Sequence, residues 1–201
     1  MEKVFEKTQI PFDVGLFVEE FIESLKTKKT PKELTVKKIS NNYANEYVLK
    51  HHYLQRKVYV AKNVSYGLFA DENCVGVCMF GYPVWKEYPG LVPPMEGAEV
   101  PELLRLCTIA NLPKNSESYF VSRCLKMMKK DWFEETGKKP KAITSLCDLA
   151  FGFNGSIYKA TNFELLRITK GRPTNPGKSH GKWKKNEHNQ EAKKAMYVKW
   201  L

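Results

Sequence analysis

One stretch of the chain, Ser145–Phe163, reads SLCDLAFGFNGSIYKATNF and organises the rest of the sequence. Ala142–Cys147 is typical of a buried strand, and Asp148 stands where that strand stops. A glycine-punctuated turn follows, and Ser156–Ala160 then reads as a short helix that carries Tyr158. A carboxylate at a strand end and a phenol on the adjoining helix can converge on one reacting atom. A plain structural role fits the same two residues, with Asp148 capping a helix and Tyr158 packing with a wet hydroxyl.

The composition indicates one folded domain with appendages. The chain has 201 residues, of which 42% are hydrophobic and 12% aromatic, enough to build a core. The sequence contains no run of about 18 apolar residues, so no membrane span is predicted. The N-terminus lacks the apolar region of a signal peptide. The five cysteines are scattered through apolar patterns, which fits a reducing compartment. We therefore expect a cytoplasmic protein.

The charge is strongly positive and unevenly placed. The net charge is +11, and residues 171–201 alone contain eight basic and two acidic residues. Such a cationic segment with interleaved aromatic and turn residues favours DNA or another polyanion, although a solubilising tail would have the same charge. The proline-rich segment 82–94 adds aromatic rings that can stack on a base or cover the core. The residues expected to contact DNA are Trp85, Tyr88, Lys178, Lys182, Trp183, Lys184 and Lys185.

The remaining pattern predicts an alternation of helices and strands. An apolar stripe behind Asp13 predicts a docking helix over 13–26, so residues 1–30 form an N-terminal helical extension before a domain at 31–201. Further helices are predicted at 40–54 and 118–136. Strands are predicted at 34–39, 64–70, 75–82, 100–109, 163–170 and 196–200.

The junction before the second of these helices is compatible with a phosphate. The N-terminus of a helix presents unpaired N–H groups and a positive dipole end, and Asn115, Ser116 and Ser118 lie there. The segment has neither the Gly-Lys-Ser/Thr of a P-loop nor the glycine fingerprint of a dinucleotide fold. It can hold the pyrophosphate of a coenzyme, and helix capping explains the same three residues.

This order of elements resembles the GNAT N-acyltransferase fold, an α/β architecture whose mixed sheet splays in the middle to admit an acyl-CoA. Within it, four local motifs resemble the phage Mom-type DNA-modification proteins. They are His-Tyr at His52–Tyr53, Leu-Leu-Arg-Leu at Leu103–Leu106, the loop Asn115–Ser118, and Asp148 with the Gly-x-x-Tyr that ends at Tyr158.

The resemblance implies an enzyme that converts adenine in DNA to its N6-carbamoylmethyl form and so blocks restriction. It implies an iron site at His52, Tyr53, Asp148 and Tyr158, which would also be the catalytic residues. Imidazole and oxygen donors suit iron. It places Arg105 and Ser118 near acetyl-CoA or a related acyl donor, with Tyr66 close by. The sequence departs from the family at Phe153, where members carry histidine.

Three functions stay open on the sequence. The first is Mom-type modification of adenine. The second is a metal-free GNAT acetyltransferase acting on a modified pyrimidine base or a protein lysine, with Asp148 as general base and Tyr158 protonating the leaving thiolate. The third is a DNA-binding module without catalysis. The sequence leaves the oligomeric state open, a homodimer included.

Overall fold

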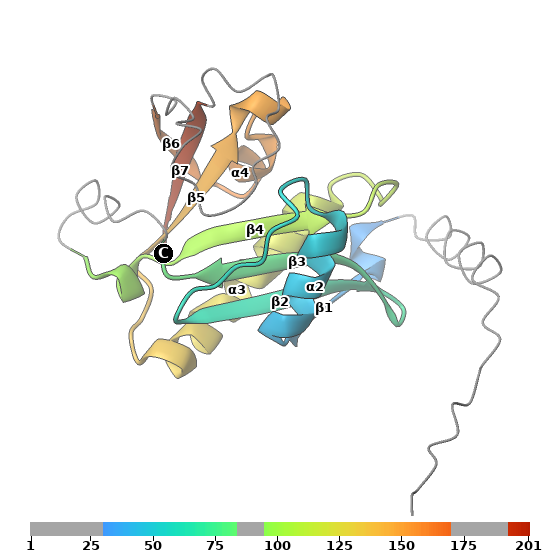
Figure 1. The fold of residues 1–201 in the computed structure, drawn as a ribbon, viewed down its shortest axis with the longest axis horizontal. Coiled ribbons are helices and arrows are strands. Elements are labelled where there is room, and N and C mark those ends of the chain that lie inside the picture. The colour runs from blue at the N-terminus through green and yellow to red at the C-terminus, as the bar shows by residue number, and fades with distance from the viewer. Residues whose placement is uncertain (1–29, 84–94, 170–192) are drawn as a thin grey trace, which may run out of the picture.

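The computed structural model describes residues 30–83, 95–169 and 193–201. Its core is a seven-stranded mixed sheet in the order β1-β2-β3-β4-β5-β7-β6. Figure 1 shows this sheet with α2 on one face and α3 on the other. The predicted helix at 13–26, most of the proline-rich segment and most of the basic segment lie outside the described residues. The division between residues 30 and 31 therefore stays a prediction.

The first half of the domain forms an antiparallel sheet with one helix on it. Ser40 caps α2, because its side chain accepts a hydrogen bond from the Tyr43 backbone N–H at 3.2 Å. Asp71 turns the chain between β2 and β3 in the left-handed region, at φ 54°. The elements are the 3-10 helices η1 (Pro31–Glu33) and η3 (Gly97–Glu99), the strands β1 (Thr35–Ile39), β2 (Asn63–Ala70), β3 (Asn73–Gly81) and β4 (Glu102–Thr108), and the helix α2 (Asn41–His51).

The second half adds the long helix and the remaining strands. Gly137 ends α3 in the left-handed conformation, as the sequence predicts for a glycine after a helix. The last strand, β7, inserts between β5 and β6 and pairs antiparallel with both. The elements are α3 (Ser116–Thr136), β5 (Ala142–Asp148), the 3-10 helix η4 (Leu149–Phe151), α4 (Ser156–Ala160), β6 (Glu164–Ile168) and β7 (Lys194–Trp200).

The sheet divides between β4 and β5, which are its parallel neighbours. They pair only at Glu102 with Thr144 and at Leu103 with Ser145, and beyond these pairs the two strands separate. In Figure 1, strands β5, β7 and β6 turn away from β1–β4. Because both strands continue past the last pair, their unpaired ends frame an opening through the sheet.

Two hydrophobic clusters hold the helices on opposite faces. One joins α3, through residues such as Phe120 and Trp132, to the inward side chains of the sheet. The other joins α2, through Ala44 and Val48, to the opposite face of β3 and β4. Because successive side chains of a strand point to opposite faces, the sheet packs against a helix on each side. Within the described residues, no helix has both the length and the apolar character needed to cross a lipid bilayer.

Candidate active site

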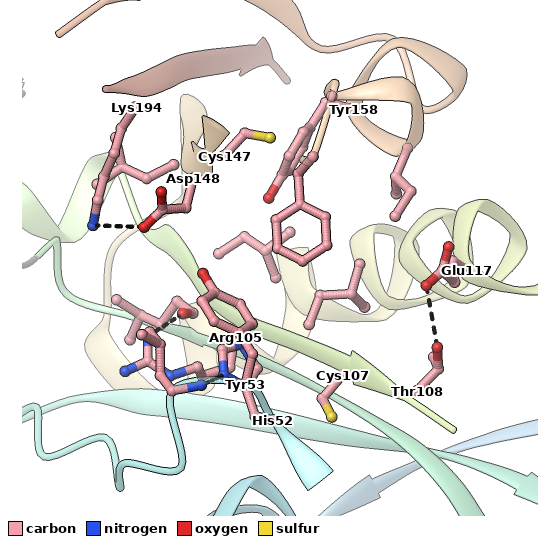
Figure 2. A pocket seen from close by; sticks show the side chains of 18 of the residues that line it. His52, Tyr53, Arg105, Cys107, Thr108, Glu117, Cys147, Asp148, Tyr158 and Lys194 are labelled. Carbon is pink, nitrogen blue, oxygen red and sulfur yellow. Dashed lines mark hydrogen bonds and ion pairs between the residues drawn. The ribbon is translucent and has the colours of Figure 1, made fainter. Parts of the chain in front are cut away.

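A cavity of about 500 Å³ occupies the opening between β4 and β5. Its walls come from both sides of the divided sheet, so residues far apart in the sequence face one another across it. Figure 2 shows Asp148 and Tyr158 on one side and His52, Tyr53 and Arg105 on the other. The lining consists of His51–Leu54 after α2, Glu102–Thr108 of β4, Glu117 of α3, Leu146–Asp148 of β5, Gly152–Tyr158 of the turn and α4, and Lys194 of β7.

Asp148 ends β5 and is buried, with 7% of its surface exposed. Its Oδ1 accepts a hydrogen bond from the Ala150 N–H at 3.2 Å, so the carboxylate caps η4 as the structural interpretation predicts. Its Oδ2 lies 3.9 Å from the Lys194 ammonium. Capping uses one oxygen only, so the second remains for a ligand in the cavity. The structural and catalytic roles are therefore compatible.

The Tyr158 hydroxyl belongs to a short chain of hydrogen bonds at the vertex of the opening. Ser145 Oγ lies 3.0 Å from Tyr158 Oη and 3.1 Å from the Leu103 carbonyl oxygen. A carbonyl can only accept, so the single Ser145 proton goes to Leu103 and the Tyr158 hydroxyl donates to Ser145. Burial raises the pKa of Tyr158, and the bond to Ser145 opposes this only in part. Tyr158 is therefore a neutral phenol that holds its proton at the cavity wall.

His52 and Tyr53 follow α2 as a stacked pair. Their ring centroids are 4.3 Å apart with 28° between the planes. The Leu54 N–H donates to His52 Nδ1 at 3.0 Å, so the neutral ring carries its proton on Nε2. Burial, and then the charge of Arg105, lower the pKa of His52 from 6.5 to about 4. Burial and Asp148 raise the pKa of Tyr53 to about 12.

Arg105 supplies a guanidinium to the wall of the cavity from β4. Its Nη1 donates to the Leu104 carbonyl oxygen at 2.6 Å. Its buried Nε has no hydrogen-bond partner in the part of the chain that the structure describes. Burial lowers the pKa of Arg105, while Tyr53 and Glu102 act in the opposite direction. The guanidinium charge at this wall suits an anionic oxygen of a bound substrate or coenzyme.

These residues do not fit the iron site that the resemblance implies. A histidine that binds a metal through one nitrogen donates a hydrogen bond from the other, whereas His52 Nδ1 already accepts one. Over residues 30–83, 95–169 and 193–201, no group of three or more His, Cys, Asp or Glu side chains is placed to hold a metal ion. The expectation of iron is therefore not supported.

The residues predicted to hold a coenzyme separate into two places. Asn115 and Ser118 line a second hollow of about 340 Å³ at the start of α3, together with Lys32. Ser116 is buried, and its hydroxyl donates to the Pro113 carbonyl oxygen at 2.7 Å. Tyr66 packs in the core under α3 and donates to Asp131 Oδ2 at 2.7 Å. The structure thus brings Arg105 to the cavity and leaves Tyr66 outside its lining.

The residues predicted to contact DNA all lie outside the described residues. They are Trp85, Tyr88, Lys178, Lys182, Trp183, Lys184 and Lys185. Their role stays a prediction.

The sequence interpretation missed three residues that the structure places at the cavity. Ser145 orients Tyr158, Lys194 pairs with Asp148, and Glu117 accepts from the Thr108 hydroxyl at 3.2 Å. Ser145 stands three positions before Asp148 on one strand, a spacing that puts the two side chains on opposite faces and so carries no local signal for a shared site. Lys194 had no such signal either, because its position depends on β7 inserting beside β5.

Comparison with solved structures agrees with the divided sheet. The chain is similar to an IAA acetyltransferase from Bacillus cereus ATCC 14579, with TM-score 0.55, 10% identity and coverage of 84% of this chain and 99% of that one. It is similar to Arabidopsis thaliana NAA60 in complex with acetyl-CoA, with TM-score 0.56, 10% identity and coverage of 84% and 98%. It is also similar to a GNAT family acetyltransferase from Elizabethkingia anophelis with acetyl-CoA bound, with TM-score 0.54, 10% identity and coverage of 84% and 99%. The predicted GNAT-like fold is thereby confirmed.

Comparison of sequences identifies a narrower group. The chain is 30% identical over 139 residues to the methylcarbamoylase Mom of Escherichia phage Mu. That match covers 67% of this chain and 54% of the relative, so it spans about half of the relative's length. The model of the Mom protein family matches residues 33–200, which include every element of the described fold from β1 to β7. The chain belongs to the Mom protein family.

Proposed function

We propose that this protein is a transferase that converts adenine in DNA to N6-carbamoylmethyl adenine. The observation that carries the proposal is the cavity between β4 and β5, where Asp148, Tyr158, Tyr53 and Arg105 converge in a chain of the Mom family. The name of the phage Mu relative, a methylcarbamoylase, supports the group transferred. The modified base would protect DNA from restriction enzymes, as the family resemblance implies.

The two sides of the cavity suit two proton transfers. The exocyclic amine of adenine is a weak nucleophile and loses a proton as its new bond to carbon forms. Asp148 Oδ2, which does not cap η4 and lies 3.9 Å from the Lys194 ammonium, accepts that proton as general base. Tyr158 lines the same cavity and retains its proton at neutral pH, so it can donate that proton to the leaving group. Ser145 keeps the Tyr158 hydroxyl directed along the wall until the leaving group competes for its proton.

A CoA thioester is the donor class that the fold suits best. Structures with a similar fold are described with acetyl-CoA bound, and the chain has a cavity between β4 and β5 and a separate hollow at Asn115 and Ser118. The carbamoylmethyl group is bonded to N6 through its methylene carbon, so acetyl transfer from acetyl-CoA does not by itself yield it. The donor must therefore carry a leaving group on that methylene carbon and already contain the amide nitrogen, since acetyl-CoA supplies neither.

The DNA partner follows from charge and from the position of the target atom. Adenine N6 takes part in base pairing, so chemistry on it requires the base to leave the duplex and enter a cavity. The net charge of +11 and the basic residues near Lys184 suit contacts to phosphates. The enzyme would act on DNA as the whole chain, with the segment 171–192 adding to affinity.

A second candidate is acyl transfer from acetyl-CoA to another amine, such as a modified pyrimidine base or a protein lysine. The Tyr158 phenol, placed as an acid beside the divided strands, favours this chemistry as much as the first. A DNA-binding module without catalysis is the third candidate. It gives no role to the Asp148 oxygen that does not cap η4 or to the Tyr158 phenol held at the cavity wall.

Mass spectrometry of nucleosides separates the three candidates. DNA from bacteria that express the chain is digested and compared with DNA from cells that express Asp148→Asn. The proposal expects a deoxyadenosine with the added mass of a carbamoylmethyl group in the first sample only. An acylated pyrimidine would support the second candidate acting on a base. Unmodified nucleosides would reject the proposal, and acylated lysine in cellular protein would then separate the second candidate from a DNA-binding module.

A further inference from the structure

Three aromatic rings form an exposed cluster at the mouth of the cavity. Tyr53 lies 4.4 Å from Phe151 and 5.4 Å from Phe153, measured between ring centroids, and the two phenyl rings are 6.4 Å apart. The exposed fractions are 42% for Tyr53, 45% for Phe151 and 47% for Phe153. We call these three residues the aromatic rim. Three large rings that contact one another and still face solvent are unusual on a charged protein.

The core does not account for the aromatic rim. Neither phenylalanine belongs to a hydrophobic cluster of the described core. The turn that carries them adopts left-handed conformations at Gly152, with φ 76°, and at Gly155, with φ 73°. These glycines direct Phe151 and Phe153 back toward Tyr53 on the far side of the opening. The aromatic rim therefore spans the two sides of the divided sheet, and its phenyl rings are not part of the hydrophobic core.

The surroundings of the aromatic rim suit a flat, polar ring attached to an anion. Tyr53 and Phe153 line the cavity together with Asp148. Arg105 and Lys194 line the same cavity and can attract phosphate. A planar base stacked on the rim thus has the proposed general base beside it and cations nearby. Aromatic stacking with adjacent cations is how proteins hold bases of single-stranded nucleic acid.

We propose that the aromatic rim is the platform on which the extruded target base stacks, and this rests on the proposed action on DNA. Phe151 and Phe153 then have a use that the core does not give them, because each supplies a stacking face. The platform assigns base binding to η4 and the following turn, in addition to the segment 82–94 that the sequence suggested.

The test measures DNA affinity while both the phenyl rings and the base are removed, singly and together. A short strand of abasic sites that carries one adenine is compared with the fully abasic strand in binding to the purified full chain. The variant is Phe151→Ala with Phe153→Ala. Phe133→Ala is the matched control, because Phe133 is 47% exposed like Phe153 and lies on α3, outside the cavity lining. The wild type and the control are expected to prefer the adenine strand by about 10-fold or more, and the double variant to lose most of that preference.

Three results would overturn the platform. They are a wild type without preference for the adenine strand, a double variant that keeps the preference, and a double variant that loses affinity for acetyl-CoA in place of base discrimination. The last result would assign the rings to the adenine of the coenzyme. Nucleoside analysis separates this from the proposed function. Wild-type modification that the double variant retains in full rejects the platform alone, whereas a base preference without any modified nucleoside supports the platform and rejects the proposed reaction.

Discussion

Ser145 shows how one buried hydroxyl sets the state of the candidate site. It lies at the last paired position between β4 and β5, with 1% of its surface exposed. Because its proton goes to the Leu103 carbonyl, it can only accept from Tyr158. Removing it would leave the buried phenol without its acceptor and a backbone carbonyl without its donor.

We predict that Ser145→Ala lowers the free energy of unfolding by about 1–2 kcal/mol, because it leaves two buried polar groups unpaired. It should also slow modification by misplacing Tyr158. Ser65→Ala is the matched control, since Ser65 is 2% exposed and its Oγ has no hydrogen-bond partner among the described residues. Ser65→Ala should be neutral or stabilising in urea unfolding. Equal losses in the two variants would contradict the network.

The buried His52 should make the free energy of unfolding depend on pH. Its pKa is lowered to about 4 in the folded state and is 6.5 in the unfolded chain, so unfolding takes up a proton between these values. The stabilising contribution of neutral His52 is complete above about pH 6.5 and is lost as the pH falls toward 4.

His52→Asn keeps an acceptor for the Leu54 N–H but does not titrate. We expect its urea midpoint to fall less between pH 7 and pH 5 than that of the wild type. His51→Asn, which changes an exposed neighbour, should follow the wild type. Parallel curves for His52→Asn and the wild type would show that the imidazole is not held neutral.

The turn between β5 and α4 is the element on which both proposals depend. Gly155 is required there for two reasons. Its φ of 73° disfavours any side chain, and a β-carbon would overlap the Tyr197 ring. Tyr197 in turn stacks on Tyr158, with 4.8 Å between centroids and 18° between planes. The turn therefore positions Tyr158 through a packed ring as well as through the helix that follows.

We predict that Gly155→Ala costs about 3 kcal/mol or more of unfolding free energy, because strain and overlap add. Gly152→Ala has the same kind of φ, 76°, but meets nothing within 4 Å. It should cost only about 1–2 kcal/mol. Denaturant unfolding of the two variants measures the difference. A Gly155→Ala protein as stable as Gly152→Ala would contradict the contact with Tyr197.

Elements were predictable where a local pattern determines them. The Ser40 cap, the Asp71 turn and the Gly137 stop lie where residue chemistry places them. The helix predicted to reach Leu54 ends at His51, because His52 leaves the helical region and its ring binds the Leu54 N–H. The earlier end of α2 sets the direction of the Tyr53 ring. A local sequence pattern could not predict this end, because it depends on packing across the sheet.

At the scale of the molecule, the convergence of four distant residues on one cavity could be predicted only through the family resemblance. Spacing relates Asp148 to Tyr158, but no local rule relates either of them to His52. The aromatic rim and Lys194 could not be predicted, because they depend on how far β4 and β5 separate and on the place of β7.

The net charge of +11 predicts how DNA binding responds to salt. Duplex affinity should fall linearly on a logarithmic scale as salt rises, because bound cations are released. Lys184→Ala with Lys185→Ala should reduce that slope by about 2 if both residues contact phosphate. Lys129→Ala with Lys130→Ala, an exposed pair on α3, is the matched control and should leave the slope unchanged. Equal slopes for all three proteins would remove the basic segment from the interface.

The amount of modified deoxyadenosine in cellular DNA tests most directly whether the cavity is the active site. Asp148→Asn keeps the shape and the cap of η4 but removes the base, and Asp71→Asn makes the same change in an exposed hairpin turn. At equal levels of folded protein, we predict wild-type amounts of modified nucleoside for Asp71→Asn and a loss of at least about 100-fold for Asp148→Asn. Undiminished modification in Asp148→Asn would contradict the account.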